Sequence, residues 1–302
     1  MAILVSKRMT TAIGLGQLAG LERSCALASP GDWIRSAPDG EGIERIEAFF
    51  SGHAYDTHRH DTYAIGYTIS GVQSFDHRGA QRDSTPGDLI VLHPDELHNG
   101  RAGIESGFRY RMAYIEPGQI MTALARRASA IPFIGNAVCR DGSLMRALVG
   151  LLGDVEHALE PLERDAAVGA LAEALLRLDP SCALDGAETP AMRACERARD
   201  FLSESRDEAI DSTMLESVTG LDRYALARQF RRRYGTSPHY YLVMRRLERA
   251  RLLIRRGEAL AEAAAASGFA DQSHMTRHFR RAYGQSPGRW RAMQVGGVPE
   301  AA

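Results

Sequence analysis

The 302-residue sequence has little cysteine and no long hydrophobic run, and both absences narrow the kind of protein that it encodes. The four cysteines, Cys25, Cys139, Cys182 and Cys195, lie far apart and form no Cys-x-x-Cys pair. This spacing fits reduced thiols better than a disulfide framework or a zinc knot. No apolar stretch approaches the ~20 residues that a membrane-spanning helix needs. We therefore expect a cytoplasmic protein with no membrane partner.

The N-terminus lacks the continuous apolar core of a secretory signal peptide. Thr10, Thr11 and Gln17 interrupt its apolar residues, and several glycines break them further. We interpret residues 1–20 as an N-terminal arm. The remaining length is sufficient for two ordinary domains with buried cores. The 44% hydrophobic and 25% charged residues are typical of globular proteins.

The net charge of −1 hides an uneven distribution of charge along the chain. From Ala191 onward there are 20 arginines and 13 acidic residues, which gives +7, whereas residues 1–190 carry −8. A basic C-terminal part behind an acidic N-terminal part indicates a polyanionic partner for the second part alone. Charge by itself is equally compatible with abundant, solvated arginine, so the placement of the arginines must decide.

An internal repeat occupies the basic part of the chain. Gly220 matches Gly268 at a spacing of 48 residues, and Arg228 matches Arg277 at a spacing of 49. The other matched pairs at that spacing are Phe230–Phe279, Arg231–Arg280, Arg232–Arg281, Tyr234–Tyr283, Gly235–Gly284, Ser237–Ser286, Pro238–Pro287 and Tyr241–Trp290. A short helical segment precedes each copy, so each copy is predicted to be a helix-turn-helix unit, at about 211–232 and 259–281.

The local signals agree with this prediction. A glycine allows the turn, and Asp222 or Asp271 can cap the helix that follows. Gly235 and Gly284 are expected to end those helices, with Phe230 and Phe279 facing the core. A plain helical bundle would explain the apolar periodicity. It would not explain why the second helix of each copy keeps arginine on its outward face.

The segment GFADQSHMTRHFRRAYGQSPGRWR, residues 268–291, closely resembles the signature of AraC/XylS-type transcriptional regulators. The upstream segment SPHYYLVMRRLERARLLI is similar to the helix that links the two motifs in that family. The resemblance implies a DNA-binding domain over residues 191–296, with seven helices and a long linking helix near 237–256. Double-stranded promoter DNA and RNA polymerase are the partners that it implies, and activation is the common mode.

The resemblance also implies which side chains face DNA. They are Arg223, Tyr224, Arg228 and Arg232 in the first motif, and Gln272, Ser273, Thr276, Arg277 and Arg281 in the second. Arg228 and Arg277 are expected to read guanine, whereas Arg231, Arg232, Arg280 and Arg281 are expected to divide between phosphate contacts and solvated or salt-bridged faces. The first motif departs from the family pattern at Glu216, where a small residue is expected; the second motif has Ala264 there.

The acidic half contains strand-like runs at 43–50, 64–70, 72–77, 88–93 and 108–115, separated by Gly and Pro turns. This pattern predicts a small antiparallel barrel or jelly roll. Within it, YDTHRHDTYAIGYTISGVQSFDHRG and TPGDLIVLHPDELHNG resemble the cupin-like effector domain that precedes many AraC-type DNA-binding domains. We assign residues 21–118 to this domain. The predicted fold class is α+β, a cupin-like barrel with flanking helices followed by an all-α domain.

The resemblance places the effector near His58, His60, Tyr63 and His98. The three histidines fall where metal-binding cupins keep theirs, and a His-x-His on a strand puts both rings on one face. The carboxylate that those cupins carry shortly afterwards is absent, because Ala64 and Ile65 stand near its place. We therefore expect pocket-lining histidines, no bound metal and no cofactor.

Residues 119–178 are expected to be helical. Leu144, Leu148, Leu151, Leu152, Val155, Leu159 and Leu162 form a stripe with a period near 3.6. The stripe can pack against the barrel or form a homodimer through a partner's helix, and both are compatible with the pattern. The segment 179–190 is predicted to be a linker.

Together these features predict a sequence-specific transcriptional activator that responds to a small-molecule effector. The alternative is a cupin-type metal-dependent enzyme, or a metal sensor, fused to a DNA-binding domain. An enzyme would need a complete set of metal ligands, and a repair protein of this family would need clustered reactive cysteines. An architectural DNA-binding protein would not need a barrel with a pocket.

Overall fold

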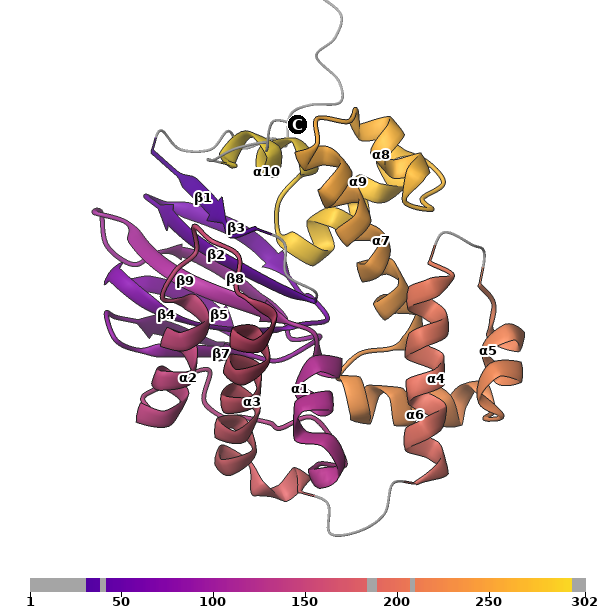
Figure 1. Ribbon diagram of the computed structural model, residues 1–302. Helices are drawn as coiled ribbons and strands as arrows, with labels where there is room; N and C mark the ends of the chain where they lie inside the picture. Colours follow the sequence, from indigo (N-terminus) through magenta and orange to yellow (C-terminus); the bar gives the residue numbers. More distant parts are fainter. Residues whose placement is uncertain (1–30, 39–41, 184–188, 207–209, 295–302) are drawn as a thin grey trace, which may run out of the picture.

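The computed structural model describes residues 31–38, 42–183, 189–206 and 210–294, which form a β-rich half and a helical half (Figure 1). The predicted arm at 1–20 lies outside the described residues, as does the centre of the predicted linker, 184–188. The order of elements is α+β as expected, with strands first and the helix-turn-helix units last.

Two antiparallel sheets build the described part of the N-terminal half. The first has the strand order β1-β2-β9-β4-β7-β10 and the second has the order β3-β8-β5-β6. Their bounds are β1 Trp33–Ser36, β2 Ile43–Phe50, β3 His53–His58, β4 Tyr63–Gly71, β5 Gln73–His77, β6 Ala80–Ser84, β7 Leu89–Leu92, β8 His98–Ala102, β9 Phe108–Ile115 and β10 Val138–Cys139. Side chains such as Phe50, Phe75 and Phe108 form the core between the sheets. The cupin-like prediction is confirmed as a sandwich of two sheets.

Five of these strands were expected from the sequence. The predicted runs at 43–50 and 108–115 coincide with β2 and β9, which pair with each other along their whole length. The strands that sequence analysis missed include β3, β6 and β8, whose sequences HAYDTH, AQRDS and HNGRA are mostly polar. They form the smaller sheet with β5, where hydrogen bonding to neighbouring strands overrides the absence of an apolar alternation.

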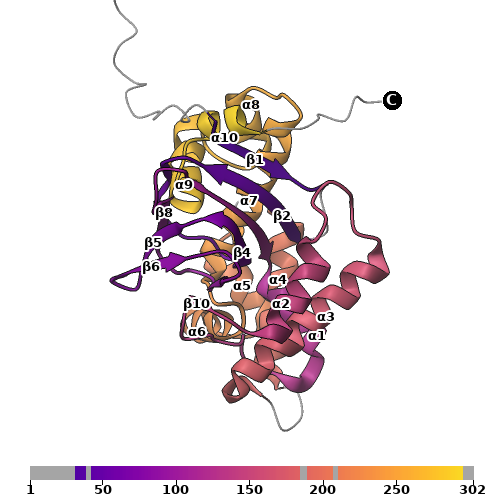
Figure 2. The same cartoon turned by 90° about the vertical axis from the view of Figure 1, so that its left-hand side faces the viewer.

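Three helices cover one face of the six-stranded sheet: α1 Pro117–Leu124, α2 Gly142–Leu152 and α3 Pro161–Leu178. Figure 2 shows them gathered beside the sheet and away from α8 and α10. The predicted helical region 119–178 is therefore interrupted, since the segment between α1 and α2 carries a short 3₁₀ turn and β10. Within the described residues, no helix is both long and apolar enough to cross a membrane.

The predicted leucine stripe divides between these elements. Leu144, Leu148, Leu151 and Leu152 are fully buried on α2, in a core shared with the sheet residues of β4, β7 and β9. Leu162 lies on α3 and its side chain is 82% exposed. The stripe is thus not one continuous surface. The four leucines of α2 pack against the sheet, so they are not available to a second subunit in this arrangement.

Seven helices form the described part of the C-terminal half: α4 Pro190–Glu204, α5 Ser212–Thr219, α6 Arg223–Tyr234, α7 Pro238–Arg255, α8 Leu260–Ala266, α9 Gln272–Tyr283 and α10 Pro287–Met293. The pairs α5–α6 and α8–α9 are the two expected helix-turn-helix units, and α7 is the expected linking helix. Phe230 packs in the core of the first unit and Phe279 in that of the second.

The local sequence explains where the second helix of each motif begins and ends. The Asp222 carboxylate accepts hydrogen bonds from the N–H groups of Tyr224 and Ala225, and Asp271 accepts one from His274. Gly235 and Gly284 end these helices with φ of 73° and 64°, a left-handed conformation that glycine adopts without strain. The two copies of the sequence repeat therefore share the same helix caps, an aspartate at the start and a glycine at the end.

The two halves dock through backbone and side-chain contacts. The N–H of Asp56 donates to the carbonyl of Gly284 at 2.9 Å, and the N–H of Arg59 donates to the carbonyl of Arg281 at 3.0 Å. These bonds place the C-terminal end of α9 against β3. Met293 of α10 is buried in the core between the two sheets. The helical half therefore completes the packing of the N-terminal half.

We expect Leu148→Ala to lower the free energy of unfolding by about 2–5 kcal/mol, because it opens a cavity between α2 and the sheet. The neighbouring variant Val149→Ala is the control, since Val149 is 52% exposed and its change should stay within about 0.5 kcal/mol. Urea denaturation followed by circular dichroism measures both. Equal losses would show that α2 does not pack as described.

Candidate effector pocket and DNA-binding face

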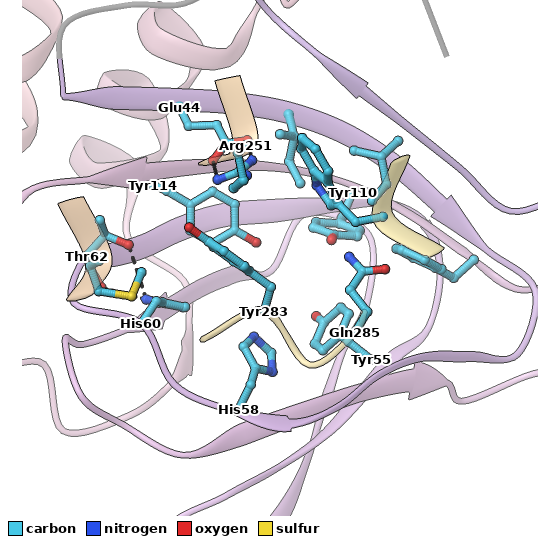
Figure 3. A pocket seen from close by; sticks show the side chains of 15 residues that line it. Glu44, Tyr55, His58, His60, Thr62, Tyr110, Tyr114, Arg251, Tyr283 and Gln285 are labelled. Atoms are coloured by element: carbon cyan, nitrogen blue, oxygen red, sulfur yellow. Dashed lines mark hydrogen bonds and ion pairs between the residues drawn. The ribbon is translucent and has the colours of Figure 1, made fainter. Parts of the chain in front are cut away.

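A cavity lies where the two halves of the chain meet, and both contribute its walls (Figure 3). The sheets supply Glu44, Tyr55, His58, Tyr110 and Tyr114, and the connection after β3 supplies His60. The helical half supplies Met244, Arg251, Tyr283, Gln285 and Trp290. The volume is about 70 Å³. That is room for several water molecules or a small ligand, since one water needs a cavity of about 10–15 Å³.

An ion pair crosses the cavity. The guanidinium of Arg251 on α7 donates to the Glu44 carboxylate on β2, with Nη1 and Oε2 2.7 Å apart, and Arg255 lies at 3.2 Å from the same carboxylate. Burial alone would raise the pKa of Glu44, but the charge and hydrogen bonds of Arg251 outweigh it and hold that pKa below its usual value. Arg251 also lies against the rings of Tyr283 and Trp290. Both charges are therefore retained inside the protein.

The tyrosines of the cavity are neutral hydrogen-bonding groups. Burial raises the pKa of Tyr55 to about 12 and raises those of Tyr110 and Tyr114 as well. The Tyr55 hydroxyl accepts a hydrogen bond from Gln73 at 3.0 Å. With Arg251, these hydroxyls give a small ligand several donors within an otherwise aromatic enclosure.

The three predicted histidines come together on the sheet side of the cavity, where His58 and His60 line it and the His98 ring lies beside them. His58 ends β3 and His98 begins β8, and the two are cross-strand neighbours. His60 lies beyond the end of β3, so the expectation that both rings of the His-x-His lie on one strand is wrong. The chain nevertheless turns so that the His60 ring centroid is 5.0 Å from that of His98.

All three imidazoles are held in one tautomer. The Nδ1 atoms of His58, His60 and His98 lie 2.9 Å from the backbone carbonyls of Asp56, Thr62 and Glu96 respectively. A carbonyl only accepts, so each Nδ1 carries the proton and each Nε2 carries the lone pair. Burial, followed by the neighbouring histidines, lowers the pKa of His58 and of His60 to about 3 and lowers that of His98 too. The cluster is therefore uncharged at neutral pH.

Tyr63, which was predicted to contact the effector, lies on the other face of the sheet. Its hydroxyl donates to the carbonyl of Pro132 at 2.5 Å, and its ring is buried in the core beneath α1, α2 and α3. Successive side chains of a strand alternate between faces. Tyr63 and Ile65 of β4 consequently point to the helices, whereas Ala64 points into the core between the sheets.

Most residues of the cavity wall were not predicted from the sequence. On β9, Tyr110 and Tyr114 lie on the face that looks into the sandwich, and on β2 the same holds for Glu44. A carboxylate at an inward position of an apolar strand was a signal that could have found Glu44. Arg251 and Tyr283 carry no such signal, because only the docking of the helical half brings them to the site.

The predicted DNA-facing residues lie on α6 and α9, which lie toward opposite ends of the long helix α7 (Figure 1). Residues that are exposed on α6 are Arg223, Tyr224, Arg228 and Arg232, and those on α9 are Gln272, Ser273, Arg277 and Arg281. Thr276 is half-buried. The opposite sides of the two helices bury Leu226, Phe230, Met275 and Phe279. Each second helix therefore presents the expected residues on one outward face.

Two arginines of α6 are held by carboxylates within the protein. The Glu216 carboxylate accepts hydrogen bonds from the backbone N–H and the guanidinium of Arg223, so the carboxylate that departs from the family pattern orients a predicted DNA contact. Arg231 pairs with Asp95 of the N-terminal half at 2.8 Å. Asp95 also pairs with Arg59. The first recognition helix is thus tethered to the β-rich half, as the second is through Arg281.

The family models match both halves of the chain. Residues 41–176 match the AraC-like ligand binding domain, and residues 215–293 match a helix-turn-helix domain. The chain belongs to the AraC family. It is therefore a DNA-binding transcriptional regulator with a ligand-binding domain, and the family is not one of enzymes.

Relatives agree with this assignment. The chain is 26% identical over 235 residues to "Uncharacterized HTH-type transcriptional regulator YbfI" of Bacillus subtilis strain 168, covering 76% of this chain and 86% of that protein. Among solved structures, ToxT of Vibrio cholerae has the same fold, with a TM-score of 0.60, 12% identity, and coverage of 85% of this chain and 100% of that one. ToxT with a bound unsaturated fatty acid gives a TM-score of 0.59 and 12% identity, covering 89% and 96% of the two chains.

Arg277→Ala is expected to weaken binding to the cognate site by about 1–3 kcal/mol and to reduce discrimination at one base pair. The physical reason is the loss of a side chain that can bond two acceptors of guanine from an exposed position on α9. Arg291→Ala on α10 is the control, because it removes the same charge from an exposed position outside both recognition helices. Fluorescence anisotropy with a set of single-base operator variants measures both. Uniform weakening on every sequence would instead make Arg277 a phosphate contact.

Proposed function

We propose that this regulator is an activator whose binding to promoter DNA is controlled by a small-molecule effector in the cavity between its two halves. The observation that carries the proposal is that residues of both halves form the walls of this cavity. Arg228 and Arg277 are proposed to read bases, and Arg223, Tyr224, Arg232, Gln272, Ser273, Thr276 and Arg281 to complete the DNA contacts. His58, His60 and His98 are proposed to line the effector site.

Effector binding and the docking of the two halves are thermodynamically linked in this proposal. A ligand can shift a conformational equilibrium only by the difference between its affinities for the two conformations. In this cavity, any movement of α7 against the sheets displaces Arg251 from Glu44 and changes the walls. An effector that touches both walls must therefore bind the two arrangements with different affinity. The expected coupling is about 1–3 kcal/mol, typical of allosteric proteins.

The chemistry of the walls restricts the effector. Arg251 supplies a positive charge, the tyrosine hydroxyls supply donors, and the aromatic rings supply apolar surface. Because Arg251 is already paired with Glu44, the walls offer hydrogen-bond donors more than net charge, and a small molecule with a carbonyl or carboxylate acceptor fits them. That ToxT has been solved with an unsaturated fatty acid supports the idea that this fold accepts a small molecule with an acidic group. A thermal-shift screen of small organic acids on the full chain tests it, since only a bound ligand stabilises by mass action.

We also propose that the chain works as a homodimer in the cytoplasm and contacts RNA polymerase. The buried leucines of α2 do not support the dimer, whereas Val149 and Leu162 leave apolar surface exposed on α2 and α3. Sedimentation at micromolar concentration tests the dimer directly. A monomer there, with an intact response to effector, would remove it from the mechanism.

We expect Glu44→Gln to tighten operator binding by the effector-free chain about 5- to 150-fold. The substitution leaves the buried Arg251 without its anionic partner and so weakens the docking that tethers both recognition helices. The measurement is fluorescence anisotropy of full-length protein on operator DNA. Glu173→Gln is the matched control, because Glu173 pairs with Arg127 at an exposed position and neither residue lines the cavity.

Two results would contradict this expectation. If wild type, Glu44→Gln and Glu173→Gln bind the operator equally, the cavity is not coupled to DNA binding. If Glu44→Gln binds more weakly, the docked arrangement is the one that binds DNA, and the proposed direction of control is reversed.

A further inference from the structure

We propose that His58, His60 and His98 bind one divalent first-row transition-metal ion, so that the wall of the effector cavity contains a metal centre. No metal is expected here from the sequence alone, because the carboxylate of metal-binding cupins is missing. The arrangement of the three rings leads to the opposite conclusion. The proposal uses the same cavity as the proposed function, but metal binding can be measured without reference to DNA or effector.

The three side chains converge from two strands and one connection. One ring nitrogen from each lies within 4.8 Å of those of the other two, and all three residues are at most 6% exposed. The ring centroids of His58 and His98 are 4.2 Å apart, and those of His60 and His98 are 5.0 Å apart. Pairing between β3 and β8 fixes two of the rings directly opposite each other. The convergence is therefore a property of the sheet and not of surface side chains.

The backbone presents these rings as ligands. Each Nδ1 donates its proton to a carbonyl two residues away in sequence, so each Nε2 keeps its lone pair. Metal-binding histidines are commonly held in the same way, by a hydrogen bond from the other ring nitrogen to a carbonyl or carboxylate. Three separate residues share this arrangement. A set of histidines that served only to fill a core would have no need of one common tautomer.

One of these lone pairs has no partner. Among the described residues, nothing donates a hydrogen bond to the buried Nε2 of His60. Leaving a buried acceptor unsatisfied costs about 1–3 kcal/mol, so such atoms are uncommon in folded proteins. The neighbouring rings cannot satisfy it, because their protons are on Nδ1. A cation bound between the three Nε2 atoms gives the His60 lone pair its partner.

The donor set indicates the class of metal. Three neutral imidazoles suit Zn²⁺, Fe²⁺, Co²⁺, Ni²⁺ or Cu²⁺, and they are poor ligands for Mg²⁺ or Ca²⁺. Around a zinc ion with Zn–N bonds of ~2.0–2.1 Å, the nitrogens lie about 3.4 Å apart. Since the three nitrogens lie within 4.8 Å of one another, binding requires them to approach by at most about 1.4 Å. Three protein ligands leave at least one open position. The missing carboxylate is thus the feature that keeps the metal accessible from the cavity.

Metal analysis of the purified full-length protein tests the proposal. We expect about one equivalent of metal per chain, its removal by a chelator, and the return of one equivalent of Co²⁺ with visible absorption bands that Zn²⁺ displaces. His58→Ala, His60→Ala and His98→Ala should each reduce bound Co²⁺ at least tenfold. His274→Ala is the matched control, because His274 and His278 form another close pair, with their Nε2 atoms 3.0 Å apart, on α9.

Folding and function are checked on the same samples. Circular dichroism identifies variants that fail to fold, and His60→Gln is a smaller change that removes the imidazole but keeps a polar side chain. If no variant folds, the wild type decides: Zn²⁺ should raise its melting temperature, and a chelator should reverse the rise. Retained operator binding by a metal-free variant would leave the proposed function in place.

Two outcomes would overturn the proposal. Wild-type protein that neither contains metal nor takes up Co²⁺ would show that the histidines are only part of the cavity wall. Undiminished Co²⁺ binding by the three alanine variants, with loss in His274→Ala, would place the metal on α9 instead.

Discussion

The docking of the helical half on the sheets depends on buried ion pairs along α7. The Arg245 guanidinium is 5% exposed and lies 2.9 Å from the Asp61 carboxylate, which is 1% exposed, and it also pairs with Glu116. Arg251 repeats the arrangement with Glu44. Burying such charges costs nearly as much solvation as their attraction returns. These pairs therefore define the orientation of the two halves without making their separation prohibitive, which is the balance that a switch requires.

The same docking reaches both DNA-binding motifs. Arg231 of α6 is tied to Asp95, and the backbone of Arg281 in α9 is tied to Arg59. Asp95 and Arg59 are themselves paired, so the two recognition helices are attached to one small region of the β-rich half. A change in docking must therefore act on both motifs together. This matters because a monomer that enters two adjacent major-groove segments needs both helices in register.

The parts of the molecule that could be predicted from the sequence are those that depend on local chemistry. Asp222, Asp271, Gly235 and Gly284 act through their own neighbours along the chain, and the helix-turn-helix units followed from them. The polar strands β3, β6 and β8 carry no such signal. The face on which Tyr63 lies changes with a shift of one residue along the strand, and its distance in sequence from the histidines does not define that register. The position of Arg251 in the cavity could not be predicted, because it arises only when the helical half docks on the sheets.

The α7 helix explains how one cavity can govern two motifs. Its residues Tyr241 and Leu242 belong to the core of the first motif, and Leu247, Ala250 and Ile254 belong to that of the second. Arg251 projects from the same helix into the cavity. A rigid helix transmits a displacement along its whole length, whereas a loop would absorb it. An effector that moves Arg251 therefore acts on the scaffold on which both recognition helices are packed, and no separate pathway between cavity and DNA is required.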